Sequence, residues 1–298
     1  MDKLIDAALD VFDRSILILG PLLLVFGWVL VCVVGYLFYS TPFMSLERHS
    51  LPIVIAVDLI GLWLWFNTLF NWFLCFKTSP GFPPTQPPAR LRHSTEETDL
   101  CQKCESFKPP RAHHCHVCQR CVLAMDHHCP WMANCIGFYS YRYFVLTLIY
   151  LTVGCVFVAT IAAVEFGIPA NLLYGAGSIS HPVFFVFFLS TCAGCAVSLL
   201  LVWHIYLILS GQTTIEFYQR RMVNPVRKTR ARRSWFSCWI FQAQSALVSN
   251  DYDLGPTENW SRVFGEGSLP FNWAMPSFKQ PPGDGIIWKD CRSLVSMV

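Results

Sequence analysis

The chain has 298 residues, of which 54% are hydrophobic and only 14% are charged, and its formal net charge is +3. Its mean hydropathy of +0.42 excludes an ordinary soluble domain and is typical of a membrane protein that carries a polar insert. The mild positive charge does not indicate a nucleic-acid partner, and we expect none.

Four apolar runs are long enough to cross a bilayer, which takes about 20 residues. They cover residues 15–39, 51–76, 143–164 and 182–209. The first run lacks the small-residue cleavage site of a signal peptide, so we expect a retained helix after a cytosolic N-terminus of residues 1–14. The sequence thus predicts an all-α integral membrane protein with four transmembrane helices, a polar loop at residues 77–142 and a tail at residues 210–298.

Basic residues beside the spans predict the orientation in the membrane. The two short loops carry only Arg48, whereas the central loop and the start of the tail are basic. These basic residues are Lys77, Arg90, Arg92, Lys103, Lys108, Arg111, Arg120 and Arg142 in the loop, and Arg220, Arg221, Arg227, Lys228, Arg230, Arg232 and Arg233 in the tail. By the positive-inside rule the central loop and both termini face the cytosol, where cysteines stay reduced. An aromatic stretch after the tail charges contains Cys238, a candidate for lipidation.

The central loop contains a dense cluster of metal-binding side chains. Seven of the chain's 14 cysteines and five of its nine histidines lie between Cys101 and Cys135, and two pairs have CxxC spacing, which lets both thiolates reach one tetrahedral ion. One self-consistent sharing gives two closed Cys3His zinc sites, which stabilise a fold and do no Lewis-acid chemistry. The first site has Cys101, Cys104, His114 and Cys121, and the second has Cys115, Cys118, His128 and Cys135.

This sharing leaves four donors over. They are His113, His116, His127 and Cys129. With Asp126 beside them, the run Asp-His-His-Cys then contains a free thiol, an imidazole and a carboxylate, which together make an activated nucleophile. In the alternative interpretation, Cys129 is one more zinc ligand and the cluster is a zinc-binding adaptor. Cys129 precedes Tyr143, the predicted start of the third helix, by 14 residues, so we expect its thiol near the bilayer surface.

The cluster resembles the cysteine-rich domain of the DHHC protein S-acyltransferases (palmitoyltransferases). The matching residues are Cys101, Cys104, Lys108-Pro109, Arg111, His114-Cys115, Cys118, Cys121, Met125-Asp126-His127-His128-Cys129-Pro130-Trp131, Asn134-Cys135 and Gly137. That family has four helices with this domain between the second and third, here about residues 99–149. The motifs that follow the fourth helix in the family match Thr213-Thr214-Ile215-Glu216, Asp253-Leu254-Gly255, Asn259-Trp260 and Phe264-Gly265. The chain departs from the family pattern at Ser79, where an aspartate is usual, and at Ser140, where an asparagine is usual.

The resemblance implies a two-step acyl transfer. Cys129 attacks the thioester of a long-chain acyl-CoA and becomes an acyl-enzyme, and a cysteine of a substrate protein then takes the acyl group. His127 takes the thiol proton and Asp126 orients and stabilises the imidazolium, while two zinc ions are structural. The partners implied are acyl-CoA, proteins with membrane-proximal cysteines and membrane lipids. The family also suggests a Golgi or endoplasmic reticulum membrane.

The acyl chain requires a dry cavity, since each buried methylene contributes about 0.8 kcal/mol. Gly154 lies 11 residues past Tyr143, which is about 16 Å along a helix that rises 1.5 Å per residue. We expect this small residue to admit chains of sixteen carbons or longer. Lys108, Arg111 and Arg120 are candidates for contact with the CoA phosphates; the alternative is that they support the zinc fold or face solvent.

Other hypotheses remain open at this point. Asp58 and His204 lie within apolar runs, where ionisable groups are functional candidates, although inter-helix hydrogen bonding is the competing interpretation. The protein as a whole could be a zinc-scaffolded membrane adaptor or an acyltransferase-like protein without activity. A membrane-tethered zinc-binding ubiquitin ligase fits less well, because the spacing around residues 126–129 is not the cross-braced pattern.

Overall fold

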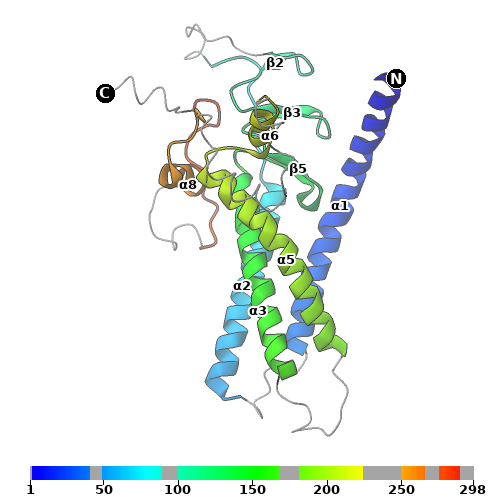
Figure 1. The fold of residues 1–298 in the computed structure, drawn as a ribbon, viewed down its shortest axis with the longest axis vertical. Helices are drawn as coiled ribbons and strands as arrows, with labels where there is room; N and C mark the ends of the chain where they lie inside the picture. The colour runs from blue at the N-terminus through cyan, green and yellow to red at the C-terminus, as the bar shows by residue number, and fades with distance from the viewer. Residues whose placement is uncertain are drawn as a thin grey trace, which may run out of the picture. The chain divides into compact units, whose positions relative to one another are not determined.

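The computed structural model of the chain describes residues 2–40, 49–88, 100–167, 181–223, 250–265 and 275–288 (Figure 1). The chain divides into two compact units. The first consists of Met1–Thr78, Cys129–Asn134 and Arg142–His204, and the second of Ser79–His128, Cys135–Tyr141 and Ile205–Val298. Several residues used in the sequence analysis lie outside the described part of the chain, namely Arg48, Arg90, Arg92, Arg227, Lys228, Arg230, Arg232, Arg233 and Cys238.

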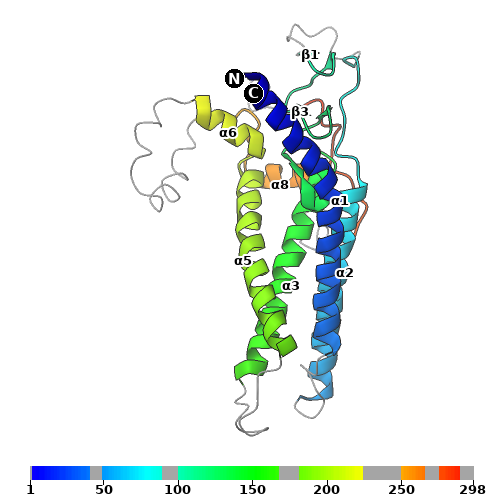
Figure 2. The same ribbon diagram turned by 90° about the vertical axis from the view of Figure 1, so that its right-hand side faces the viewer.

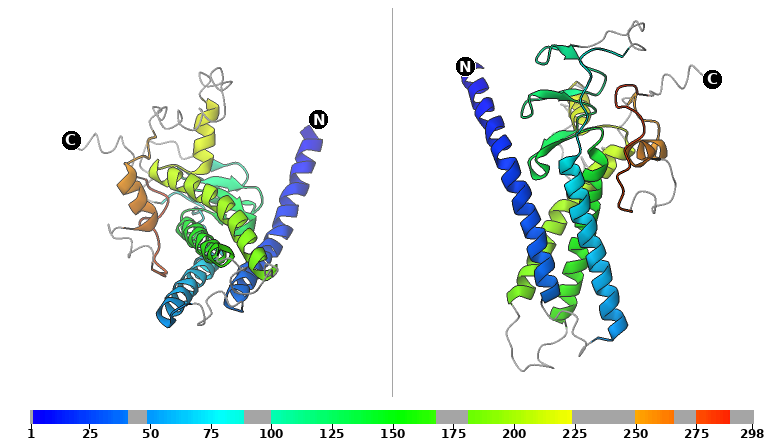
Figure 3. Two further views of the ribbon diagram at one scale, coloured as in Figure 1. Left: turned by 60° about the horizontal axis from the view of Figure 1, so that its bottom comes forward. Right: turned by 180° about the vertical axis from the view of Figure 1, so that it is seen from behind.

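The first unit is built on four long helices. They are α1 (Asp2–Ser40), α2 (Leu51–Lys77), α3 (Tyr141–Gly167) and α5 (His181–Leu209), whose last residues belong to the second unit. Each is long and apolar enough to cross a membrane, and they run alongside one another (Figures 1, 2 and 3). Apolar side chains are exposed along their outer faces, as expected of helices that face lipid. The predicted fold class is confirmed.

Glycine residues let α1, α2 and α3 approach closely. A Cβ at Gly27 of α1 would lie 2.5 Å from the Trp72 ring of α2, and a Cβ at Gly61 of α2 would lie 2.6 Å from the Tyr39 hydroxyl. The Trp65 indole of α2 donates a hydrogen bond to the Val31 carbonyl of α1, over 3.3 Å. At Gly27 and Gly61 the missing side chain leaves room for an aromatic side chain of the neighbouring helix.

Residues 129–134 attach to the C-terminal part of α2 within the first unit. The side-chain amide of Asn134 donates to the carbonyls of Cys75 and Thr78, over 2.9 and 2.8 Å, at the C-terminus of α2. Since the last carbonyls of a helix have no intrahelical donor, this side chain provides one. The Trp72 indole also donates to the Trp131 carbonyl, over 3.0 Å. Both contacts fix the short 3-10 helix η2 (Pro130–Met132), which follows Cys129 directly.

The cysteine-rich segment forms three pairs of very short strands. They are β1 (Leu100–Cys101) with β2 (Ser106–Phe107), β3 (His113–Cys115) with β4 (Arg120–Val122), and β5 (His127–Cys129) with β6 (Asn134–Ile136). In the second pair His114 lies opposite Cys121, which brings together two donors predicted to share an ion. Strands of two or three residues bury too little apolar surface to be stable alone. Small domains of this kind are commonly stabilised by bound metal ions.

The second unit also contains two short helices, α6 (Thr214–Val223) and α8 (Pro256–Phe264) (Figure 1). Asn259 of α8 is buried and donates to the Leu209 carbonyl, over 3.0 Å, and to the Asp253 carboxylate. This asparagine therefore ties α8 to the end of α5 within the second unit.

The two departures from the family pattern make local hydrogen bonds. Ser140 is buried, and its hydroxyl accepts from the Gly137 amide over 3.1 Å and donates to the Cys135 carbonyl over 3.0 Å. The Ser79 hydroxyl accepts from the Gly81 amide over 3.3 Å. Both serines therefore support the turns in which they lie.

The two ionisable residues noted inside apolar runs differ in their surroundings. His204 is 2% exposed and its ring packs edge-on against Phe144, with 4.9 Å between centroids. Asp58 is half-buried, and its backbone carbonyl accepts a hydrogen bond from the Tyr39 hydroxyl over 3.0 Å. A functional role for either side chain stays a prediction.

Candidate active site and metal centres

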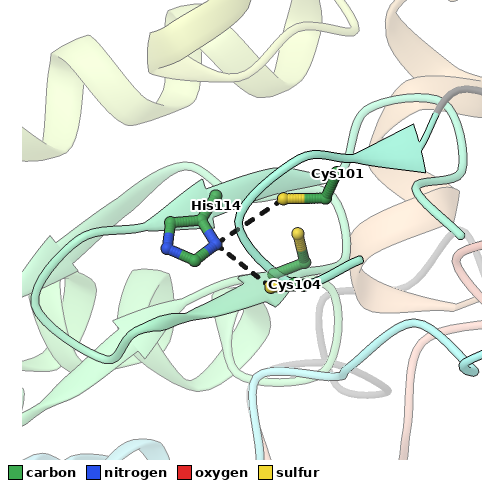
Figure 4. A group of neighbouring side chains, drawn as sticks. Cys101, Cys104 and His114 are labelled. Carbon is green, nitrogen blue, oxygen red and sulfur yellow. Dashed lines mark hydrogen bonds between the residues drawn. The ribbon is translucent and has the colours of Figure 1, made fainter. Parts of the chain in front are cut away.

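The first group of metal-binding side chains surrounds the imidazole of His114. Its Nδ1 atom lies 3.1 Å from the Cys104 sulfur and 3.7 Å from the Cys101 sulfur, and Figure 4 shows the three side chains pointing toward one another. With Cys121, the four donor atoms all lie within 4.8 Å of one another. This is the set that the spacing predicted for the first zinc ion.

Two thiols of this first group, Cys101 and Cys121, differ strongly in pKa. Burial opposes the ionisation of Cys101, but hydrogen bonds from the Cys104 backbone and the Cys121 thiol lower its pKa to about 7. Burial and the hydrogen bonds to Cys101 and Cys104 raise the pKa of Cys121 to about 12. Cys101 and Cys121 therefore do not ionise together without a cation, and a thiolate-rich tetrahedral set suits zinc.

The second group repeats this arrangement around His128. Its Nδ1 atom lies 3.8, 3.3 and 3.4 Å from the sulfurs of Cys115, Cys118 and Cys135, and the four donor atoms again lie within 4.8 Å. Hydrogen bonds to the Cys118 and Cys135 thiols hold the pKa of Cys115 far below its usual range, and hydrogen bonds to the Cys115 and Cys118 thiols raise the pKa of Cys135 far above it. Both predicted donor sets are thus assembled, and both fit zinc.

Two leftover imidazoles, those of His113 and His116, are not members of these donor sets, although the His116 ring packs edge-on against that of His114, with 5.6 Å between centroids. Within the described residues, neither His113 nor His116 belongs to a cluster that could hold a metal. The His116 Nδ1 lies 3.0 Å from the Lys103 ammonium. Burial lowers the pKa of His113, and the positive charges of Lys108 and Arg111 lower it further.

Asp126 and His127 form a hydrogen-bonded pair. The Nδ1 atom of His127 lies 2.7 Å from Oδ2 of Asp126, and the aspartate side chain is only 1% exposed, whereas that of the histidine is 31% exposed. A carboxylate accepts only, so Nδ1 carries the proton and Nε2 is left as the acceptor. The pair therefore has the geometry of an oriented general base.

Residues distant in the sequence hold the Asp126 carboxylate. The amide of Thr214 donates to Oδ1 over 2.8 Å and its hydroxyl donates to Oδ2 over 2.9 Å. Thr214 begins α6, whose start is closed by a reciprocal capping box: the Thr213 amide donates to the Glu216 carboxylate, and the Glu216 amide donates to the Thr213 hydroxyl. The helix start thus presents a donor pair to the buried carboxylate.

Arg111 closes this network from the other side. Its Nε and Nη2 atoms donate to the two carboxylate oxygens of Glu216, over 2.7 and 2.9 Å, and both side chains are less than 10% exposed. Nη2 also donates to the Gly211 carbonyl over 3.1 Å. Such a bidentate, buried pair fixes geometry more firmly than an exposed one.

The three basic residues considered for the CoA phosphates therefore differ. Arg111 is engaged with Glu216. Arg120 is exposed, and its guanidinium lies 3.8 Å from the ring centroid of Phe82. Lys108 is half-buried.

Cys129 lines an apolar cavity within the first unit. The cavity has a volume of about 440 Å³, within the range of roughly 300–1,000 Å³ typical of ligand sites. Side chains of α1, α2, α3 and α5 surround it, together with Cys129, Trp131 and Met132. Cys129 itself is 6% exposed. A sulfur atom is thus placed at the wall of a space that suits a hydrocarbon chain.

Gly154 of α3 also lines this cavity. A Cβ built at this position would have no atom within 4 Å, so the glycine leaves open space beside it. The opposite situation holds at Gly194 of α5, where a Cβ would lie 3.0 Å from that of Cys155. A larger side chain at Gly154 would therefore extend into the cavity without first displacing a neighbour.

Sequence reasoning identified the DHHC run and the threonine motif but not how they meet. It assigned no role to Thr214, and Trp288, which lies beside Arg111, was not singled out. The capping-box spacing from Thr213 to Glu216 was a signal for the start of a helix. No sequence signal pointed to the partner of that helix start.

Comparison with known proteins agrees with this geometry. The sequence profile of the DHHC palmitoyltransferases matches residues 94–221. The chain is 32% identical over 232 residues to "Probable protein S-acyltransferase 15" of Arabidopsis thaliana, covering 75% of this chain and 84% of that protein. It is 27% identical to "Palmitoyltransferase ZDHHC16A" of Danio rerio (88% of this chain, 78% of that protein) and 31% identical to "Palmitoyltransferase ZDHHC2" of Mus musculus (68% and 50%). From the profile match and the extent of these similarities, the chain belongs to the DHHC palmitoyltransferase family.

Proposed function

We propose that this protein transfers a long-chain acyl group from acyl-CoA to cysteine thiols of substrate proteins, through an acyl-enzyme on Cys129. The observation that carries the proposal is the position of Cys129 at the wall of the 440 Å³ apolar cavity. On the same strand, β5, the chain provides His127 hydrogen-bonded to Asp126. A nucleophile, a base and a hydrocarbon-binding space thus come from one short segment and the helices that it contacts.

The first chemical step forms a thioester on the enzyme. His127 accepts the Cys129 proton at Nε2, and the resulting thiolate attacks the carbonyl carbon of the acyl-CoA thioester. The bond to the CoA sulfur breaks, and the CoA thiolate leaves and takes up the proton from the imidazolium. The Asp126 carboxylate, 2.7 Å from Nδ1, stabilises the imidazolium while it exists.

The second step repeats this sequence with another thiol. A cysteine of a substrate protein loses its proton to His127, attacks the acyl-enzyme and releases Cys129. Since one thioester is exchanged for another in each step, the transfer needs no ATP. Zinc held by the two Cys3His groups would fix the backbone on both sides of the reacting residues, and none of its closed coordination positions would be open to substrate.

The acyl chain is proposed to lie in the cavity and to extend toward Gly154. Burial of a sixteen-carbon chain is favourable by about 0.8 kcal/mol per methylene, so the cavity supplies binding free energy remote from the reacting carbonyl. For the CoA phosphates, Lys108 and Arg120 are the remaining candidates, since the Arg111 guanidinium is bound to Glu216.

The setting is part of the proposal as well. The family suggests a Golgi or endoplasmic reticulum membrane for this multi-pass protein. The gathering of basic residues in the central loop and the tail supports a cytosolic position for the cysteine-rich segment. Substrate proteins would then present cysteines close to the membrane surface.

The test is acylation of the purified full-length protein by labelled palmitoyl-CoA. We expect a label that hydroxylamine removes, as a thioester requires, and its loss in Cys129→Ser with zinc content unchanged. Cys32→Ser, in which an exposed cysteine of α1 is replaced, is the matched control and should label normally. Loss of zinc in Cys129→Ser would favour the adaptor hypothesis, in which this sulfur is a ligand.

A further inference from the structure

The Arg111 guanidinium lies between two aromatic rings of the C-terminal region. It is 4.3 Å from the ring centroid of Trp288 and 4.8 Å from that of Tyr252. Cation–π contacts of this kind are strongest where water is excluded, and the Arg111 side chain is only 7% exposed. Trp288 thus contributes to the surroundings that hold Arg111 against Glu216.

The segment that carries Trp288 has a defined local structure. The Asp284 carboxylate accepts hydrogen bonds from the amides of Ile286 and Ile287, over 2.9 and 3.1 Å, and the Trp288 indole donates to the Gly285 carbonyl over 3.2 Å. This turn fixes the tryptophan ring from within its own segment.

Phe138 anchors the same segment. Its ring packs edge-on against Trp288, with 5.6 Å between centroids. At Gly285, φ is +70° and a Cβ would lie 2.8 Å from the Phe138 ring, so only glycine fits without displacement. The position of Trp288 is therefore sensitive to a change at Gly285, which lies three residues before it.

A continuous set of contacts connects Trp288 to the Asp126 carboxylate. Arg111 binds Glu216, Glu216 closes the start of α6, and Thr214 at that start donates two hydrogen bonds to Asp126. Trp288 and Asp126 also line one small cavity of about 70 Å³, enough for water molecules. The ring and the carboxylate thus border the same small cavity.

From this arrangement we infer that Trp288 is a positioning residue for acyl transfer, acting through Arg111, Glu216 and Thr214 on the orientation of Asp126. The inference rests on the proposed function. Its consequence is that Trp288, which is far from the reacting groups in the sequence, supports their alignment from the C-terminal region.

The experiment compares single-turnover self-acylation by labelled palmitoyl-CoA in Trp288→Leu, Trp288→Phe and Ile287→Ala. Trp288→Leu keeps a large apolar side chain but removes the aromatic face, and we expect its rate constant to fall about tenfold through loss of alignment. Trp288→Phe, which restores an aromatic face, should recover most of the rate. Ile287→Ala, at an exposed neighbour, should match the wild type.

The amplitude and the substrate dependence distinguish positioning from folding. Positioning predicts unchanged burst amplitude, unchanged KM for palmitoyl-CoA and unchanged zinc content in Trp288→Leu, with only the rate constant reduced. Gly285→Ala should give the same pattern by displacing the ring. In an Arg111→Met background, Trp288→Leu should have little further effect on the rate constant, because both changes remove one interaction.

Two results would overturn the inference. The first is a wild-type rate constant in both Trp288→Leu and Gly285→Ala, whether or not the amplitude falls. The second is a rate loss in Trp288→Leu that is undiminished in the Arg111→Met background. Absence of hydroxylamine-sensitive label in the wild type would instead overturn the proposed function, and this inference with it.

Discussion

Thr214 holds the carboxylate of Asp126, a residue 88 positions earlier in the chain, through both its amide and its hydroxyl. The two hydrogen bonds occupy Oδ1 and Oδ2, and Oδ2 also contacts His127 Nδ1. The carboxylate orientation is therefore set by the start of α6 and then passed to the imidazole. A threonine motif outside the cysteine-rich segment thus has a direct place beside the proposed base.

Replacement of Thr214 by valine should slow acyl transfer about tenfold. Valine keeps the amide and the shape but removes the hydroxyl, and a hydrogen bond to a charged group contributes about 1.5–3 kcal/mol. Thr214→Ser, which retains the hydroxyl, should be close to wild type. The measurement is the single-turnover rate of self-acylation, and equal rates for the two variants would refute a role for the hydroxyl.

Gly154→Phe should shift the acyl-chain preference toward shorter substrates. The glycine borders open space in the cavity, so an aromatic ring there would shorten it. The check is competition among acyl-CoAs of different length, scored by mass spectrometry of the acyl-enzyme. Gly194→Phe, on α5 and not among the residues that line the cavity, serves as a packing control. An unchanged chain-length profile in Gly154→Phe would discard the idea.

Replacement of either Arg111 or Glu216 alone should strongly lower the stability of the protein. Loss of one partner of a buried ion pair leaves an uncompensated charge, which costs about 3–5 kcal/mol. We therefore expect a large drop in thermal stability for Arg111→Met and for Glu216→Gln alone. The double variant should recover part of it, because no unpaired charge remains. If the loss of stability in the double variant equals the sum of the losses in the two single variants, the two residues are not coupled.

Zinc content should separate ligands from bystanders. Cys118→Ala should lose about one of two ions per chain, whereas His116→Ala, at a leftover imidazole, should keep both. The analysis is elemental, by mass spectrometry of purified protein. Retention of both ions in Cys118→Ala would contradict the second assigned set.

Zinc retention should also depend on pH in a defined direction. Burial acts against protonation of His128, but hydrogen bonds with Cys115 and Cys118 raise its pKa to about 9 in the metal-free chain, and the pKa of Cys121 is raised to about 12. Since each ligand must give up its proton to bind, zinc affinity falls as the pH falls. Stability provided by zinc is therefore present at neutral pH and lost on acidification, which chelator titrations at pH 7.5 and 5.5 would measure.

The amino-acid sequence alone determined features that depend on local spacing and composition. Four apolar runs predicted four long helices because spanning a bilayer requires continuous hydrophobicity. CxxC spacing and a count of donors predicted the two groups that the structure assembles, because two thiolates at that spacing can reach one tetrahedral ion. The predicted spans lie within the observed helices, and at all ends except residues 51 and 209 the helix continues past the apolar segment.

Only the tertiary structure decided which distant residues meet. Hydrogen bonds from Thr214 to Asp126, the ion pair of Arg111 with Glu216 and the contact of Trp288 with Arg111 join residues that are 88, 105 and 177 positions apart. The cavity beside Cys129 likewise arises from four helices together, each of which is apolar all round and gives no sign of which face will enclose it. Spacing in the sequence determines which nearby side chains can bind one ion or react together. The packing of helices and strands determines which distant side chains contact them.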